Sequence, residues 1–171
     1  HDYLLIFTNR GKCYWLRVYD VPSLTRQSKG RSIANLLNLG NQQIASIIAV
    51  SSFEDAEGTP ERQLVMATKN GLIKKTRLNA YGNPRANGVI AINLDPNDAL
   101  IGVSMTTGEN EIILGTRDGM TIRFNEQEAR SMGRNSRGVH GIRLRPQDEV
   151  VGMVIVEEKA SLFTVCENGY G

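Results

Sequence analysis

The sequence predicts an all-β fold, a propeller-like array of four-stranded blades with about three complete blades and the start of a fourth. Three observations support this prediction. A short turn motif recurs four times, and a basic, polar loop follows each of the first three turns at a nearly constant distance. No segment sustains helical periodicity over three turns. Four-stranded units of about 40–50 residues are typical of propeller blades.

The turn motif follows an apolar run in every unit. Its four copies are Thr8–Gly11, Thr68–Gly71, Thr116–Gly119 and Cys166–Gly169. Asn-Gly and Asp-Gly pairs between apolar runs are strong hairpin signals, because both central residues of a type I′ turn need φ > 0. We therefore expect four β-hairpins with turns of this type.

A second glycine lies 17 to 19 residues after each of the first three turn glycines, in a basic loop; these are Gly30, Gly88 and Gly138. After each loop the pattern predicts a short strand, a polar connector and a longer apolar strand. The short strands are expected at residues 35–39, 91–94 and 141–144, and the longer ones at 44–50, 100–105 and 150–156. Each repeat should thus supply four strands: the hairpin, the short strand and the long strand.

The repeat units are expected at approximately residues 3–50, 64–105 and 112–156, with an incomplete unit at 162–171. The stretch 51–63 is acidic, contains Gly58 and Pro60, and indicates a loop inserted between two units. The chain starts without Met and stops just after a hairpin turn. An unclosed array would expose strand edges, so we expect residues 1–171 to be part of a longer repeat domain.

The charges are unevenly distributed, although the formal net charge is only +2. Five arginines and no acid lie between Arg130 and Arg145, whereas four acids and no base lie between Glu54 and Glu61. Apolar residues make up 40%, which is enough for a core. Cys13 and the distant Cys166 have no metal-ligand spacing. Neither a membrane-spanning run nor a secretory signal is recognisable, so we predict a cytoplasmic protein.

The sequence offers no set of catalytic residues. His140 is a lone histidine in a basic region, and no Ser or Cys partner can be placed beside it. The glycine-rich strings match neither of the common phosphate-binding motifs, and no pair of acids can be placed around a cleft. We therefore expect no catalytic residues, no metal site and no cofactor in this part of the chain.

Basic residues recur at equivalent places in the units and form the candidate DNA-binding set. Its members are Lys12, Arg17, Arg26, Lys29, Arg31, Lys74, Lys75, Arg77, Arg85, Arg123, Arg130, Arg134 and Arg137. Stacked blades would place them along one curved stripe, and small polar neighbours would allow backbone N–H groups to approach phosphates. A single arginine in such a loop is more often an ordinary solvated residue, but the recurrence favours a shared surface. Tyr14 and Trp15 are expected to pack within a strand rather than to stack on bases.

The same residues resemble a known family. The C-terminal domain of bacterial DNA gyrase A is resembled by Thr8–Tyr14 with Val21-Pro22 and Lys29–Arg31, by Met66–Gly71 with Lys74–Thr76, and by Met132–Arg134 with Gly138–Leu144. The resemblance covers essentially the whole chain. The C-terminal domain of the topoisomerase IV counterpart shares the blade motif and is a close second within these type IIA topoisomerases.

The resemblance implies a β-pinwheel, a propeller relative in which neighbouring blades exchange strands. It also implies that duplex DNA bends around a basic rim and so supports ATP-dependent negative supercoiling by the intact enzyme. The partners implied are double-stranded DNA, the gyrase A N-terminal region and gyrase B, with ATP and Mg used by other regions. The family's Gln-Arg-Arg-Gly-Gly-Lys-Gly box is absent here, and none of the five tyrosines inherits the catalytic role.

Two functional hypotheses remain open at this point. One is a DNA-wrapping module that contacts phosphates without reading sequence. The other is a propeller-type protein-interaction scaffold without DNA binding. The Gly-His and Trp-Asp pattern of WD repeats is missing, and a scaffold does not require arginines at equivalent loop positions.

Overall fold

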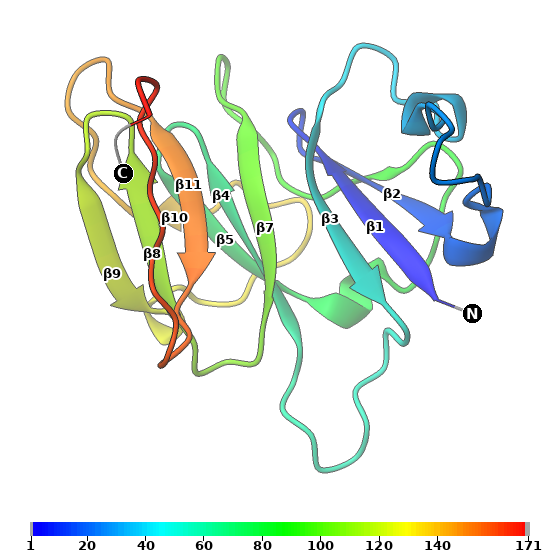
Figure 1. The fold of residues 1–171 in the computed structure, drawn as a ribbon. Coiled ribbons are helices and arrows are strands. Elements are labelled where there is room, and N and C mark those ends of the chain that lie inside the picture. The colour runs from blue at the N-terminus through cyan, green and yellow to red at the C-terminus, as the bar shows by residue number, and fades with distance from the viewer. Residues whose placement is uncertain (1, 170–171) are drawn as a thin grey trace.

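The computed structural model describes residues 2–169 and confirms the all-β, propeller-like class. Three antiparallel sheets lie side by side as successive blades (Figure 1). The strands are β1 (Tyr3–Thr8), β2 (Lys12–Arg17), β3 (Ile44–Val50), β4 (Gln63–Thr68), β5 (Leu72–Arg77), β6 (Val89–Ile90), β7 (Leu100–Thr106), β8 (Glu111–Thr116), β9 (Thr121–Asn125), β10 (Val139–His140) and β11 (Val150–Ile155). Four short 3-10 helices connect them: η1 (Val18–Asp20), η2 (Ile33–Asn35), η3 (Leu78–Tyr81) and η4 (Glu126–Glu128).

Neighbouring blades exchange a strand. The sheet orders are β3-β1-β2-β6, β10-β5-β4-β7 and β11-β8-β9. β6 belongs to the second repeat in sequence but pairs with β2 of the first, and β10 of the third repeat pairs with β5 of the second. The second and third repeats supply four strands each, as expected, and the first supplies three; the exchange implied by the family resemblance is observed.

The exchanged strands are also shorter and earlier than the pattern predicted. Residues 91–94 and 141–144 do not form strands, and residues 35–39 follow η2 without becoming one. The reason is visible in the backbone hydrogen bonds. The N–H groups of Ala91 and Ile92 both donate to the carbonyl of Gly11, at 2.8 and 3.2 Å. The chain thus leaves the ladder and folds over the turn of the preceding blade, which buries Ile92.

The hairpin turns recur with one geometry, but it differs from the predicted type I′. The first two loops hold three residues between their strands and the third holds four, and only the glycine of each has positive φ: 73° at Gly11, 83° at Gly71 and 79° at Gly119. Each of these glycines donates its N–H to the carbonyl of the motif's first residue, a threonine. This is the pattern of a type I turn followed by a glycine bulge, which needs one left-handed residue instead of two.

Side chains of β2 and β5, the strands next to the exchanged edge strands β6 and β10, form hydrogen bonds to the following blade. Trp15 on β2 and Lys75 on β5 hold equivalent register positions, opposite Leu5 and Val65. Trp15 Nε1 donates to the carbonyl of Tyr81 in η3 at 2.8 Å. Lys75 Nζ donates to the carbonyl of Glu126 in η4 at 2.9 Å. An aromatic and a lysine thus perform the same structural task at successive junctions.

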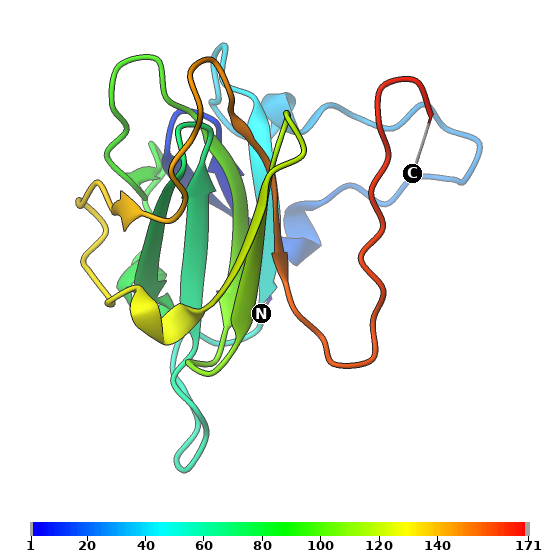
Figure 2. The ribbon, with the colours of Figure 1, turned by 90° about the vertical axis from the view of Figure 1, so that its left-hand side faces the viewer.

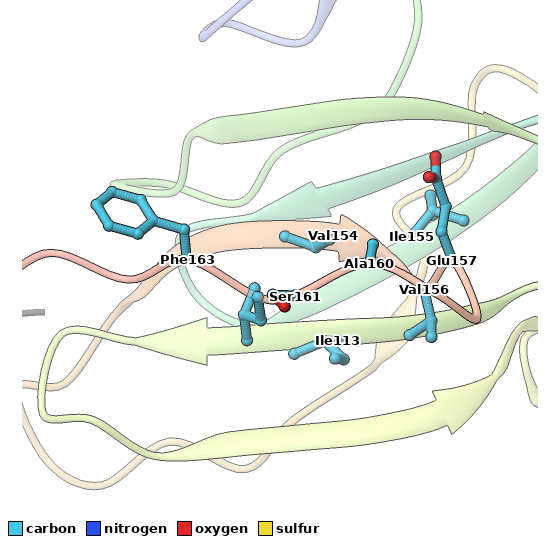
Figure 3. A pocket seen from close by; sticks show the side chains of 9 residues that line it. Ile113, Val154, Ile155, Val156, Glu157, Ala160, Ser161 and Phe163 are labelled. Carbon is cyan, nitrogen blue, oxygen red and sulfur yellow. The ribbon is translucent and has the colours of Figure 1, made fainter.

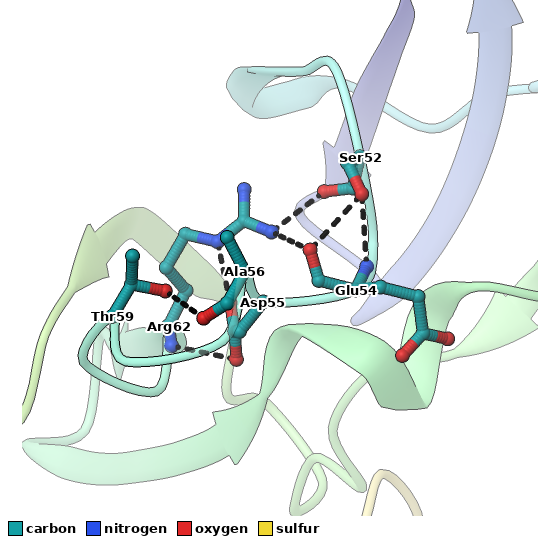
Figure 4. A network of polar contacts seen from close by, with 6 residues as sticks. All are labelled: Ser52, Glu54, Asp55, Ala56, Thr59 and Arg62. Atoms are coloured by element: carbon teal, nitrogen blue, oxygen red, sulfur yellow. Dashed lines mark hydrogen bonds and ion pairs between the residues drawn. The ribbon is translucent and has the colours of Figure 1, made fainter.

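Two extended segments leave the blades. The insertion between β3 and β4 projects from the molecule in both views (Figures 1 and 2). Arg62 closes it through four hydrogen bonds: two to the Asp55 carboxylate and one each to the carbonyls of Ser52 and Glu54 (Figure 4). The segment after β11 was expected to begin a fourth unit with a hairpin. It forms no strand among the described residues, although the turn closed by Gly169 is formed.

Candidate nucleic-acid interface

The basic loops lie at the outer edge of the blades. The innermost strands β3 and β11 both contact β7, and β6 and β10 form the opposite edges of their sheets. The loops that carry Gly88 and Gly138 lead directly into β6 and β10, whereas the loop that carries Gly30 leads into η2. Exposed members of the candidate set are Arg17, Arg26, Lys29, Arg31, Arg77, Arg85, Arg123, Arg130 and Arg137, and Lys12 and Arg134 are half-buried. These eleven side chains are thus at least partly accessible to solvent.

Lys74 and Lys75 are a correction to the candidate set, because both are buried. The fractional exposure of Lys74 is 0% and that of Lys75 is 5%, which removes them from the exposed rim. Lys74 Nζ donates to the carbonyls of Ala91, at 2.5 Å, and of Arg134. Desolvation, helped by the nearby charge of Arg134, lowers the pKa of Lys74 to about 7. Both lysines therefore hold blades together.

Lys75 belongs to a buried ion pair across the second blade junction. Its Nζ lies 3.6 Å from Oε2 of Glu126, whose fractional exposure is 0%. The same carboxylate accepts hydrogen bonds from Thr106 Oγ1 at 2.8 Å and from the N–H groups of Gly108 and Asn110 at 2.9 Å. Sequence reasoning missed this pair because the two residues are 51 positions apart and both types are usually exposed.

Several rim arginines form exposed ion pairs. Arg77 Nε lies 2.9 Å from Glu61 Oε1, Arg123 pairs with Glu111, and Arg137 pairs with Asp95. Exposed pairs of this kind contribute little to stability, so their guanidinium groups can exchange a carboxylate for a phosphate.

Arg17 has a different partner. Its guanidinium donates to the hydroxyl of Tyr19 at 2.5 Å and lies 5.7 Å from the centroid of that ring. The neighbouring aromatic residues of β2 behave as expected. Tyr14 is buried at 2% exposure, and Trp15 is partly buried with its indole nitrogen bonded. Neither ring is presented as a free stacking surface.

Other reactive groups are dispersed. Cys13 is buried, and burial raises the pKa of its thiol. His140 is exposed on β10, opposite Leu72. Within residues 2–169 no group of three or more His, Cys, Asp or Glu is arranged to hold a metal ion. Nor does this part of the chain contain a helix long and apolar enough to cross a bilayer.

A cavity of about 250 Å3 lies between β8, β11 and the segment that follows them (Figure 3). Ile113, Val154 and Leu162 make its wall largely apolar, and Glu157 is the only titratable residue that lines it. It offers no convergent polar groups of the kind that a catalytic site requires.

The antiparallel blades and their exchanged edge strands together define a β-pinwheel. A family model described as "DNA gyrase C-terminal domain, beta-propeller" matches residues 2–51, 62–107 and 110–157. The chain belongs to this family. The three matched segments follow the three repeats, which indicates that the family is built from the same unit.

Curated relatives include DNA gyrase A of Haloquadratum walsbyi, which is 44% identical over all of this chain and 20% of its own length. DNA gyrase A of Salmonella typhimurium is 41% identical over all of this chain and 19% of its own length. The chain thus spans about a fifth of these relatives.

Two solved structures share the fold. The C-terminal domain of a DNA topoisomerase IV superimposes with a TM-score of 0.83 at 31% identity, covering 92% of this chain and 48% of that one. A DNA gyrase A C-terminal domain gives 0.73 at 26% identity, covering 92% and 49%. The described fold therefore corresponds to about half of such a domain.

Proposed function

We propose that this chain binds duplex DNA along its outer rim, without reading base sequence, and bends the DNA around successive blades. The observation that carries the proposal is the exposure of basic side chains on the loops of three repeats, two of which lead into the exchanged edge strands. Lysine and arginine gain binding free energy from phosphates through counterion release, whatever the bases. The rim carries no helix of the length that enters a major groove, since the longest described helix has four residues.

In the longer protein, this rim would hold a DNA segment for a type IIA topoisomerase that introduces negative supercoils. The expected partners are the gyrase A N-terminal region and gyrase B, which would use ATP and Mg elsewhere in a cytoplasmic complex. Because the Gln-Arg-Arg-Gly-Gly-Lys-Gly box is absent from this chain, we expect it to bind DNA without completing a supercoiling wrap by itself.

A mobility-shift titration with a duplex at low and physiological salt tests the proposal. We expect binding that weakens steeply with salt, because each phosphate contact releases counterions. The alternative function is a protein-interaction scaffold. Duplex binding that is absent at low salt, or that does not respond to salt, would favour the scaffold.

Charge reversal at Arg134 and Arg137 tests the absence of base reading. Replacing both with Glu should weaken binding by the same factor for duplexes of unrelated sequence, since phosphate contacts carry no base information. A loss confined to one sequence would contradict the backbone-contact model.

A further inference from the structure

A cleft recurs at the two blade junctions. The first, of about 320 Å3, lies between Arg17 at the end of β2 and the following blade's loop residues Pro84, Arg85 and Ala86. The second, of about 310 Å3, lies between Arg77 at the end of β5 and the following blade's residues 131–133. Arg17 and Arg77 occupy the same register position, opposite Tyr3 and Gln63. The clefts therefore recur at equivalent places, each between the end of a strand and a loop of the following repeat.

Each cleft has an arginine on one wall and a loop segment of the following repeat on the other. In the first cleft the second wall carries Arg85. In the second cleft the wall 131–133 lies between Arg130 and Arg134 in sequence. Small residues line both loop walls, Ala86 in one and Gly133 in the other, so an anionic group can approach the backbone closely. Tyr3, Tyr14 and Trp15 also line the first cleft, whereas no aromatic residue lines the second, so a phosphodiester group rather than a stacked base is the ligand that both clefts can share.

The two clefts differ in the group that bonds to the guanidinium of their arginine. Arg17 donates to the neutral hydroxyl of Tyr19, although Asp20 also lines the first cleft. Arg77 instead pairs with the Glu61 carboxylate at 2.9 Å. Glu61 precedes Arg62, whose four hydrogen bonds close the insertion (Figure 4) and whose carbonyl accepts the N–H of Leu78 at 2.9 Å. The insertion thus holds a carboxylate beside Arg77.

We propose that the two junction clefts are the phosphate-binding subsites of the rim, and that Glu61 competes with DNA phosphate for Arg77 in the second. This inference rests on the proposed DNA binding and specifies where the backbone is held. The insertion between the first two repeats would then set the relative strength of the two subsites, with the first binding more tightly. Removal of the Glu61 charge should release the second subsite to full strength.

Fluorescence anisotropy with a labelled duplex at low salt separates these contributions. We expect Arg17→Gln to raise Kd about tenfold, as for a lost charge-assisted contact, and Arg77→Gln to raise it only about threefold. Glu61→Gln should lower Kd about threefold. In the Glu61→Gln background, Arg77→Gln should then cost about tenfold, because the competing carboxylate is gone.

Matched controls remove the same charge elsewhere. Arg117→Gln changes an exposed arginine in the third hairpin turn, and Glu109→Gln changes an exposed acid in the β7–β8 connection; both should shift Kd less than about twofold. The inference is overturned if Arg17→Gln and Arg77→Gln match Arg117→Gln, or if Glu61→Gln matches Glu109→Gln. Loss of all duplex binding by the unmodified chain would instead overturn the proposed function, which keeps the two failures distinguishable.

Discussion

Gly71→Ala tests how far strand exchange stabilises the blade junction. A Cβ at Gly71 would lie 2.8 Å from the carbonyl oxygen of Ile142 and 3.1 Å from its Cγ2. The backbone around that oxygen has little room to move, since Gly141 and Ile142 donate to the Gly71 carbonyl at 2.9 and 3.3 Å. We expect about 1 kcal/mol from the left-handed backbone at φ 83° and about 1–3 kcal/mol from overpacking. The free energy of unfolding should fall by about 2–4 kcal/mol in urea denaturation.

Gly119→Ala is the matched control. Gly119 has the same place in its hairpin and φ of 79°, but no atom lies within 4 Å of its added Cβ. Only the backbone cost should appear, about 1 kcal/mol. Equal losses at positions 71 and 119, with an unchanged dependence on urea concentration, would refute the claim that the exchanged segment packs tightly on the turn.

Two further predictions concern the buried charges. Burial in the folded chain lowers the pKa of Lys74 from 10.5 to about 7, so between these pH values the unfolded chain binds more protons than the folded chain. The free energy of unfolding should therefore rise with pH in this range, by up to about 1.4 kcal/mol per pH unit. Lys74→Met should flatten that rise. A rise of equal slope in both proteins would contradict the assignment. Glu126→Gln should destabilise the fold by about 3 kcal/mol in urea denaturation because it leaves Lys75 buried without its counter-charge, and adding Lys75→Met should recover part of the loss. A loss below about 1 kcal/mol for the single change would argue against the pair.

The repeat could be recognised from the sequence because its hairpin turns and their glycines involve residues that are close together in the chain. A turn glycine with positive φ follows from the spacing of apolar runs around Gly11 and Gly71, and the family motifs indicated the pinwheel. The exact turn type was wrong because a three-residue loop and a two-residue loop present the same Asn-Gly or Asp-Gly signal.

The repeat pattern alone could not show which blade each exchanged strand joins. Alternation at residues 91–94 indicates that Ile92 is buried, but not which blade buries it. The same limit applies to Lys74 and Lys75, whose position after a hairpin turn resembles that of the exposed Arg123. Burial there depends on the following blade, which covers β5 through η4 and β10.

Hydrogen exchange of the chain with and without a duplex tests the central claim most directly. We expect protection on DNA binding at the rim loops, residues 83–88 and 130–138, with no change in the hairpin turns or in the inner strand β7. Protection concentrated in the hairpin turns or in β7, with the rim loops unchanged, would contradict it.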